Sequence, residues 1–198
     1  MSASDPQQPV PMGKRNGNPD PVFLAHDELK PELSENIALV DYWRSLPRAP
    51  GKAPLNSDFD LLDVPHLLGA CLILDLEGPT TWPIKLFGSD LVTHFGIDAT
   101  GLNGYDLYPP EEREAVTTRL HTMSERAAIM LTHSRLKNAA DVTIRTEWVF
   151  LPLANEAGKV ERVLISIAAF DRATDHNTFE MNGTMNDRRL LKLVYACD

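Results

Sequence analysis

The sequence predicts an α+β domain that combines five short strands with several helices. Residues 142–153 alternate between apolar and polar side chains, as expected of a strand with one buried face. In residues 110–126, apolar side chains recur every three or four positions, the period of a helix that buries one side. Two further apolar runs, 69–77 and 82–88, are separated by the turn signal Gly78–Pro79.

The amino-terminal part divides into a tail and a helix. Residues 1–33 carry few large apolar groups, and nine of the 15 prolines fall in the first 54 residues, so we expect a flexible tail. Residues 34–56 are predicted as an N-terminal helix and linker, with Ser34 as N-cap and Pro47 at the end. The helix carries an apolar stripe with helical spacing, formed by Leu39, Trp43 and Leu46.

The rest of the chain supplies the other predicted elements. After the two apolar strands, a short helix over 89–95 ends at Gly96. The long helix starts at Pro110 and has an apolar stripe formed by Val116, Leu120, Met123 and Ala127. Three strands follow, at about 128–136, 142–153 and 160–170. The C-terminal extension, residues 172–198, reads as a short helix or an extra strand, which either packs on the domain or docks a partner.

Charge and composition narrow the classes of partner. The formal net charge is −9, from 28 acidic and 19 basic residues, which argues against a nucleic-acid partner and an anionic membrane surface. No apolar run approaches the roughly 18 residues of a membrane span, and the polar first residues do not resemble a signal peptide. A free thiol at Cys197 suits a reducing compartment, and Cys71 reads as a buried residue. We therefore expect a cytoplasmic protein.

No catalytic residue and no metal site is predicted from residue spacing. The histidines at 26, 66, 94, 121, 133 and 176 include no pair with the i, i+4 spacing of a helical zinc site. Asp58, Asp60 and Asp63 lack the spacing of a calcium loop and are predicted to cap a helix start. Gly88-Ser89-Asp90 does not match the nucleophile elbow of hydrolases.

Several short motifs lie between Ser57 and Leu102. They are DFD-L-D-PHLL at Asp58–Leu68, DLE at Asp75–Glu77, LFGS at Leu86–Ser89, Phe95-Gly96 and Thr100-Gly101. In this order they resemble the opening half of a PAS domain, in the form found in short stand-alone PAS proteins of alphaproteobacteria. The predicted order of strands and helices extends the resemblance over residues 57–171.

The resemblance implies a fold and a role. The fold would be a five-stranded antiparallel sheet with helices on one face, plus the N-terminal helix. The role would be that of a sensory or adaptor protein that signals without catalysis, through contacts with another signalling protein, with or without control by a small organic ligand. PAS proteins often pair through amphipathic N-terminal helices, so the stripe of Leu39, Trp43 and Leu46 is the expected seam of a homodimer or partner complex.

The resemblance does not lead to a cofactor. Some PAS proteins bind haem through a histidine on the long helix, but His121 lies about 130° from the apolar stripe of that helix. Light-sensing PAS domains carry a reactive cysteine in an Asn-Cys-Arg-Phe motif. Nothing similar occurs near residues 102–107, and Cys71 lies in another element.

A ligand pocket is expected between the sheet and the helices. If the strands pair with Thr132 opposite Thr146, then Met130, Thr132 and Ser134 share a face with Ile144, Thr146 and Trp148. That face is apolar with a few hydroxyls, which suits a modest organic ligand. The predicted pocket residues are Phe87, Phe95, Tyr105, Met123, Met130, Thr132, Thr146 and Trp148. Two alternatives stay open: the side chains fill the core without a ligand, or a one-residue change of register exchanges the two faces.

Two other functions compete with this interpretation. One is a small cone-shaped α+β enzyme that uses an acid–base pair, His133 with Glu147 or Asp141. The other is a purely structural partner for another PAS protein, which would have an empty and fully packed interior.

Overall fold

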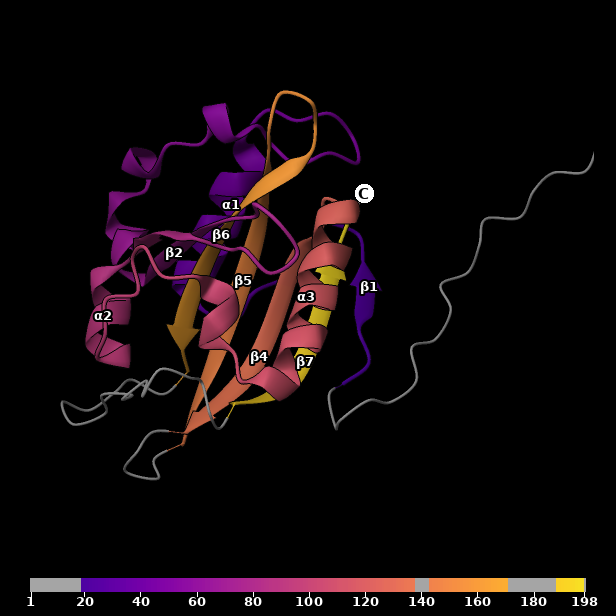
Figure 1. Cartoon of the computed structure of the whole chain (residues 1–198). Helices are drawn as coiled ribbons and strands as arrows, with labels where there is room; N and C mark the ends of the chain where they lie inside the picture. Colours follow the sequence, from indigo (N-terminus) through magenta and orange to yellow (C-terminus); the bar gives the residue numbers. More distant parts are fainter. Residues whose placement is uncertain (1–18, 138–142, 171–187, 198) are drawn as a thin grey trace, which may run out of the picture.

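A seven-stranded sheet organises the computed structural model of the chain, which describes residues 19–137, 143–170 and 188–197 (Figure 1). The strands are β1 (Val22–Leu24), β2 (Cys71–Asp75), β3 (Ile84–Phe87), β4 (Ile129–Lys137), β5 (Thr143–Ala154), β6 (Val160–Ala169) and β7 (Arg188–Ala196). Their order in the sheet is β1-β7-β4-β5-β6-β2-β3. Neighbouring strands are antiparallel except β1 and β7, which are parallel.

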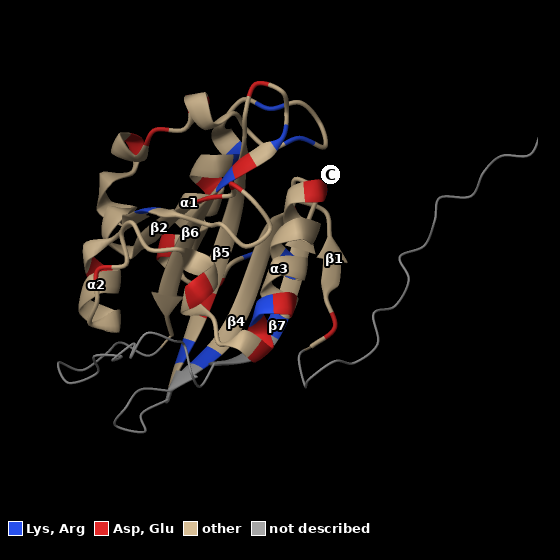
Figure 2. Ribbon diagram, viewed as in Figure 1, with Lys and Arg blue, Asp and Glu red and all other residues tan. Residues whose placement is uncertain are grey.

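Helices cover both faces of this sheet. The longer ones are α1 (Ser34–Ser45), α2 (Ser89–Phe95) and α3 (Pro110–Glu125), and short 3₁₀ turns are η1 (Asn56–Asp58), η2 (Leu61–Asp63), η3 (Pro65–Ala70) and η4 (Gly104–Leu107). One apolar cluster joins α2 and α3 to the sheet, and a second joins α1 and η3 to the opposite face. The helix α3 carries acidic and basic residues as well as the apolar residues that face the sheet (Figure 2). Within the described residues, no helix combines the length and apolar character that a membrane crossing requires.

The α+β class and the antiparallel five-stranded core are confirmed, but the sheet has two strands more than predicted. β7 lies in the C-terminal extension and pairs with β4. Its side chains are buried on both faces: Leu193 and Tyr195 toward α3, and Val194 and Ala196 toward α1. A strand covered on both faces shows no alternation, and therefore its sequence did not distinguish a strand from a helix.

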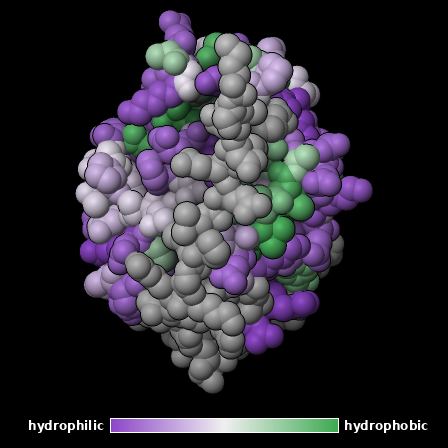
Figure 3. Space-filling view, turned by 90° about the vertical axis from the view of Figure 1, so that its right-hand side faces the viewer, coloured by the Kyte–Doolittle hydropathy of each residue, from purple (hydrophilic) through white to green (hydrophobic). Residues whose placement is uncertain are grey.

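β1 lies within the segment predicted as a flexible tail. It pairs with β7 in the register Val22↔Val194, and the nearby Leu29 is only 2% exposed. Residues 19–33 are therefore packed against the domain, and residues 1–18 lie outside the described part. The side of the molecule that carries β1 shows hydrophobic surface among hydrophilic residues (Figure 3), and Val22 and Phe23 are exposed there.

The apolar stripe of α1 packs on its own sheet. Leu39 and Trp43 are fully buried and Leu46 is 8% exposed, and the Trp43 indole N–H donates to the Pro152 carbonyl at 2.8 Å. The predicted seam is therefore part of the core. An amphipathic stripe indicates that a helix is covered on one side, but it does not say whether the cover is its own chain or a partner.

Two of the sequence motifs meet at a close backbone contact. Gly88, in the LFGS motif, donates its N–H to Cys71 at 2.8 Å. A Cβ atom on Gly88 would overlap the carbonyl oxygens of Leu68 and Gly69 at the end of the PHLL motif. The β3–α2 junction can approach η3 only because this residue is glycine, which ties the two motifs together physically.

Because the α1 stripe is core, we expect Leu39→Asp to lower the free energy of unfolding by more than about 3 kcal/mol, since it places a carboxylate in an apolar site. The matched control is Ile37→Asp on the same helix, where the side chain is 40% exposed, with an expected change under about 1 kcal/mol. Urea denaturation of both variants measures the difference. A Leu39→Asp protein that keeps its stability but loses a dimer would restore the seam interpretation.

Candidate functional site

Two polar regions lie back to back on the central strands β4 and β5. The register pairs Thr132 with Trp148, His133 with Glu147 and Ser134 with Thr146. It differs by two residues from the pairing assumed in the sequence analysis, and a shift of two leaves every side chain on its predicted face. Thr132 and Thr146 therefore face α3, whereas His133 and Glu147 face α1.

The α3 face contains a small cavity. Its volume is about 10 Å³, and its lining residues are Tyr108, Val116, Arg119, Leu120, Met130, Thr132 and Phe150. The space is close to the minimum that one water needs. The Thr132 side chain is fully buried, and its hydroxyl has no hydrogen-bond partner among the described residues. A buried hydroxyl without a partner is costly, so a polar group placed in the cavity would gain a hydrogen bond here.

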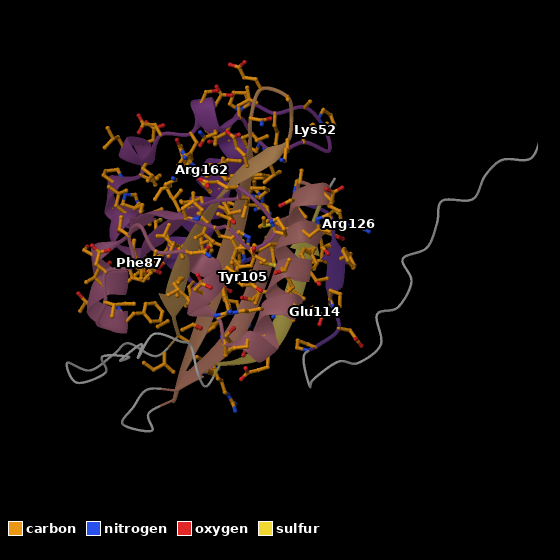
Figure 4. The ribbon with its side chains drawn as sticks, viewed as in Figure 1. Lys52, Phe87, Tyr105, Glu114, Arg126 and Arg162 are labelled. Carbon is orange, nitrogen blue, oxygen red and sulfur yellow. The ribbon has the colours of Figure 1, made fainter. Side chains whose placement is uncertain are left out.

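Of the eight predicted pocket residues, Met130 and Thr132 line this cavity. Thr146 and Trp148 are buried beside it, with the Trp148 indole N–H bonded to the Thr146 hydroxyl at 2.8 Å. Three others, Phe87, Phe95 and Met123, are packed in the same apolar core. Tyr105 lies on η4 against Trp82, well away from Phe87 (Figure 4).

Five of the residues that line the cavity were not predicted from the sequence. The predicted stripe of the long helix contains Val116 and Leu120, and Phe150 belongs to the same alternating run as Trp148. These patterns could have identified all three. Arg119 gave no such signal, because a charged residue beside an apolar stripe is normally exposed, yet here it is 8% exposed.

On the opposite face, the carboxylate of Glu147 is buried beneath the start of α1. It accepts the backbone N–H groups of Glu32 at 2.9 Å and Leu33 at 3.1 Å, and the side-chain amide of Asn36 at 3.0 Å. His133 Nε2 lies 2.9 Å from Glu147 Oε2 and must donate, because a carboxylate only accepts. The Glu147 side chain is fully buried, so these donors replace the water it has lost.

Glu147 holds the residues that lead into α1 from a distant strand. The N-cap residue is Leu33, which has no capping side chain, and the hydroxyl of Ser34 donates instead to its neighbour Glu35. The prediction that Ser34 caps the helix is therefore wrong. A negative charge near the positive end of a helix is favourable, and β5 places the Glu147 carboxylate against the two N–H groups that precede Ser34.

The balance of forces keeps Glu147 ionised. Burial on its own raises the pKa of this carboxyl, but hydrogen bonds from His133, the Glu32 N–H, Asn36 and the Leu33 N–H outweigh it and leave the pKa below its ordinary value. At neutral pH the group is an anion held by several donors.

The acid–base pair of the enzyme alternative is thus partly formed, since His133 and Glu147 are in contact. Asp141, its other candidate, lies outside the described residues. The pair faces α1 and the cavity faces α3, so a ligand in the cavity would not meet it. Glu147 also accepts hydrogen bonds from Glu32, Leu33 and Asn36, which gives the pair a structural role beneath α1.

The remaining sequence candidates have structural roles. Asp60 accepts the N–H of Leu62 at 2.8 Å and caps η2, as predicted. Asp63 accepts the Tyr42 hydroxyl at 2.8 Å and caps no helix. Burial raises the pKa of the Cys71 thiol to about 12, so it is not a nucleophile. His121 is exposed on α3.

If Glu147 holds α1, Glu147→Gln should lower the free energy of unfolding by about 2 to 3 kcal/mol at neutral pH. Because the folded pKa is depressed, this contribution is present above the unfolded value near pH 4.3 and is lost as pH falls through the folded pKa. The two unfolding curves should therefore converge once the pH lies below the depressed folded pKa of Glu147. Glu35→Gln is the matched control, and a constant gap between Glu147→Gln and wild type down to pH 2 would refute the assignment.

Comparisons with known proteins agree with this architecture. The family profile described as PAS domain matches residues 32–168. None of the curated protein sequences matches the chain.

Solved structures with a similar arrangement include light-oxygen-voltage domains. A structure described as a flavin analogue in a light-oxygen-voltage domain is 19% identical and covers 58% of this chain and 87% of its own, with a TM-score of 0.45. The Rhodobacter sphaeroides LOV protein is 15% identical, with 55% and 62% covered and a TM-score of 0.42. A PAS domain from Colwellia psychrerythraea is 17% identical, with 58% and 100% covered and a TM-score of 0.41. Since the family profile spans well over half of its length, the chain belongs to the PAS domain family.

Proposed function

We propose that this chain is a cytoplasmic sensory or adaptor protein that signals through protein contacts and is controlled by a small ligand beneath α3. The observation that carries the proposal is the hydroxyl of Thr132, fully buried in the cavity and without a partner among the described residues. Membership of the PAS domain family supports a sensory role.

The lining of the cavity favours a particular class of ligand. Apolar groups from Val116, Leu120 and Phe150 surround the Thr132 hydroxyl, and Arg119 brings a positive charge close by. This combination suits a small organic molecule with a polar or anionic group. Because the cavity volume is only about 10 Å³, such a ligand would have to displace α3 outward, which provides the conformational response.

The sheet offers a direct route from the cavity to α1. Thr132 lines the cavity, and the next residue, His133, bonds to Glu147 beneath α1. A shift of β4 caused by a ligand would therefore change the network that holds the start of α1. We propose α1 and the segment before it as the signalling element, with another signalling protein or a second copy of this chain as the partner.

Native mass spectrometry of the freshly purified chain, followed by denaturation, tests the ligand. We expect a discrete extra mass that is released on unfolding, and hydrogen exchange of α1 should be faster or slower when the ligand is present. A chain without bound mass, and whose α1 exchange does not respond to a library of small carboxylates, would reject ligand control. That result would support the structural-partner alternative.

Thr132→Val should change protein stability and ligand affinity in opposite directions. We expect the free energy of unfolding to rise by about 1 kcal/mol, since the unpaired hydroxyl is removed, and ligand affinity to fall about tenfold, since one hydrogen bond is lost. Thr146→Val is the matched control and should lower stability, because it removes the hydroxyl that accepts the hydrogen bond of the Trp148 indole N–H. Equal ligand affinity in Thr132→Val and wild type would show that this hydroxyl does not contact the ligand.

A further inference from the structure

We propose that Glu32, His133 and Glu147 form a binding site for a divalent transition-metal cation, with zinc as the fitting ion. Each residue offers one ligand atom, and the three atoms lie within 4.8 Å of one another. The residues come from three segments: the chain before α1, β4 and β5. No motif in the sequence could have shown this, because metal motifs depend on ligands close together in one segment.

The distances suit a compact coordination sphere. His133 Nε2 lies 2.9 Å from Glu147 Oε2 and 3.7 Å from Glu32 Oε1. In a tetrahedral zinc site with bonds of about 2.0 to 2.1 Å, ligand atoms are about 3.3 Å apart, so each of these two distances would change by about 0.4 Å on binding. The third pair, Glu32 and Glu147, lies within 4.8 Å and closes by rotation of the exposed Glu32 side chain. One imidazole and two carboxylates are ligands that zinc accepts, and three protein ligands leave a fourth position for water. The Nε2 proton that His133 donates to Glu147 must leave when the ion binds, so the imidazole coordinates through Nε2 and keeps its proton on Nδ1, and the ion replaces the hydrogen bond between the two side chains.

The three side chains of the cluster differ in exposure, and the exposed side gives an ion access from solvent. The side chain of Glu147 is fully buried, that of His133 is 15% exposed and that of Glu32 is 55% exposed. Glu147 is already anionic and fixed by backbone and amide donors, so one ligand is oriented before the ion arrives. Glu32 can rotate to close the site from the solvent side.

A cation of the chain already lies at the rim of this cluster. The Lys192 ammonium is 4.0 Å from Glu32 Oε1, and Lys192 is the β7 neighbour of His133. The ammonium shows that the carboxylate attracts positive charge here, and it would compete with a metal ion for Glu32. Removal of the Lys192 ammonium should therefore strengthen metal binding. That effect is not expected if Glu32, His133 and Glu147 have only structural roles.

Bound metal would join the segment before α1 to the two central strands. At present that connection consists of hydrogen bonds to Glu147, and coordination of Glu32 would add a bond from the exposed side. The ion would therefore hold the start of α1 in its docked position. This inference does not depend on a ligand in the α3 cavity, and either proposal can fail without the other.

Isothermal titration of zinc chloride into the full, tag-free chain tests the site. We expect one ion per chain and a thermal midpoint that rises by roughly 7 °C when zinc is at a hundred times its dissociation constant. Glu32→Gln should weaken binding at least tenfold without altering the metal-free stability, because its backbone N–H still donates to Glu147. The matched control is Glu35→Gln, three residues further along the chain, which should bind zinc with the affinity of the wild type.

Three results would overturn the assignment. They are a wild type that binds no zinc at 1 mM, a Glu32→Gln variant that binds as tightly as wild type, and sulfur ligands in the X-ray absorption spectrum of the zinc complex, which would assign the ion to a cysteine. Lys192→Met should bind zinc several-fold more tightly, and weaker binding by that variant would also count against the site.

Discussion

The buried carboxylate of Glu147 is the constraint on which the arrangement of this molecule depends. An anion without water requires donors, and the donors here are the N–H groups at the start of α1, the Asn36 amide and His133. The bond to Glu32 spans 115 positions of the chain, so it exists only when β5 and the amino-terminal segment are both in place. The docking of α1, the placement of β5 and the hydrogen bonding of the Glu147 carboxylate therefore depend on one another.

The strands β4 and β5 connect Glu147 to the cavity on the other face of the sheet. Successive side chains of a strand point to opposite faces, so the residue that lines the cavity and the residue that contacts Glu147 are neighbours in sequence. The central strands are thus a thin partition with a small cavity on one side and the anchor of α1 on the other. Any change in their twist or spacing acts on both sides at once.

Local pattern was sufficient for most elements of the fold. The start of α2 at Ser89, its end at Gly96, the start of α3 at Pro110 and the faces of β4 and β5 were all predicted correctly, because each follows from nearby residues. The N-cap of α1 was not, since Ser34 is a good local candidate but the N-cap is Leu33, and the bonds that hold this segment come from Glu147 on a distant strand.

The candidate sites show the same limit. The faces of Thr132 and His133 followed from alternation, but the size of the cavity and the burial of Arg119 depend on how α3 rests on the sheet. The cluster of Glu32, His133 and Glu147 arises from three segments that only the tertiary fold brings together. β1 was missed because three residues with few neighbours carry too little pattern, and their strand identity comes from pairing with β7.

The parallel pairing of β1 with β7 also sets an order of events in folding. Residues 22–24 find their partners only at residues 194–196, so their hydrogen bonds close one of the longest loops in the chain. During synthesis β1 stays unpaired until β7 has left the ribosome and paired with β4. Until then β4 has an open edge, and for that interval a nascent chain is exposed to aggregation through strand pairing with its neighbours.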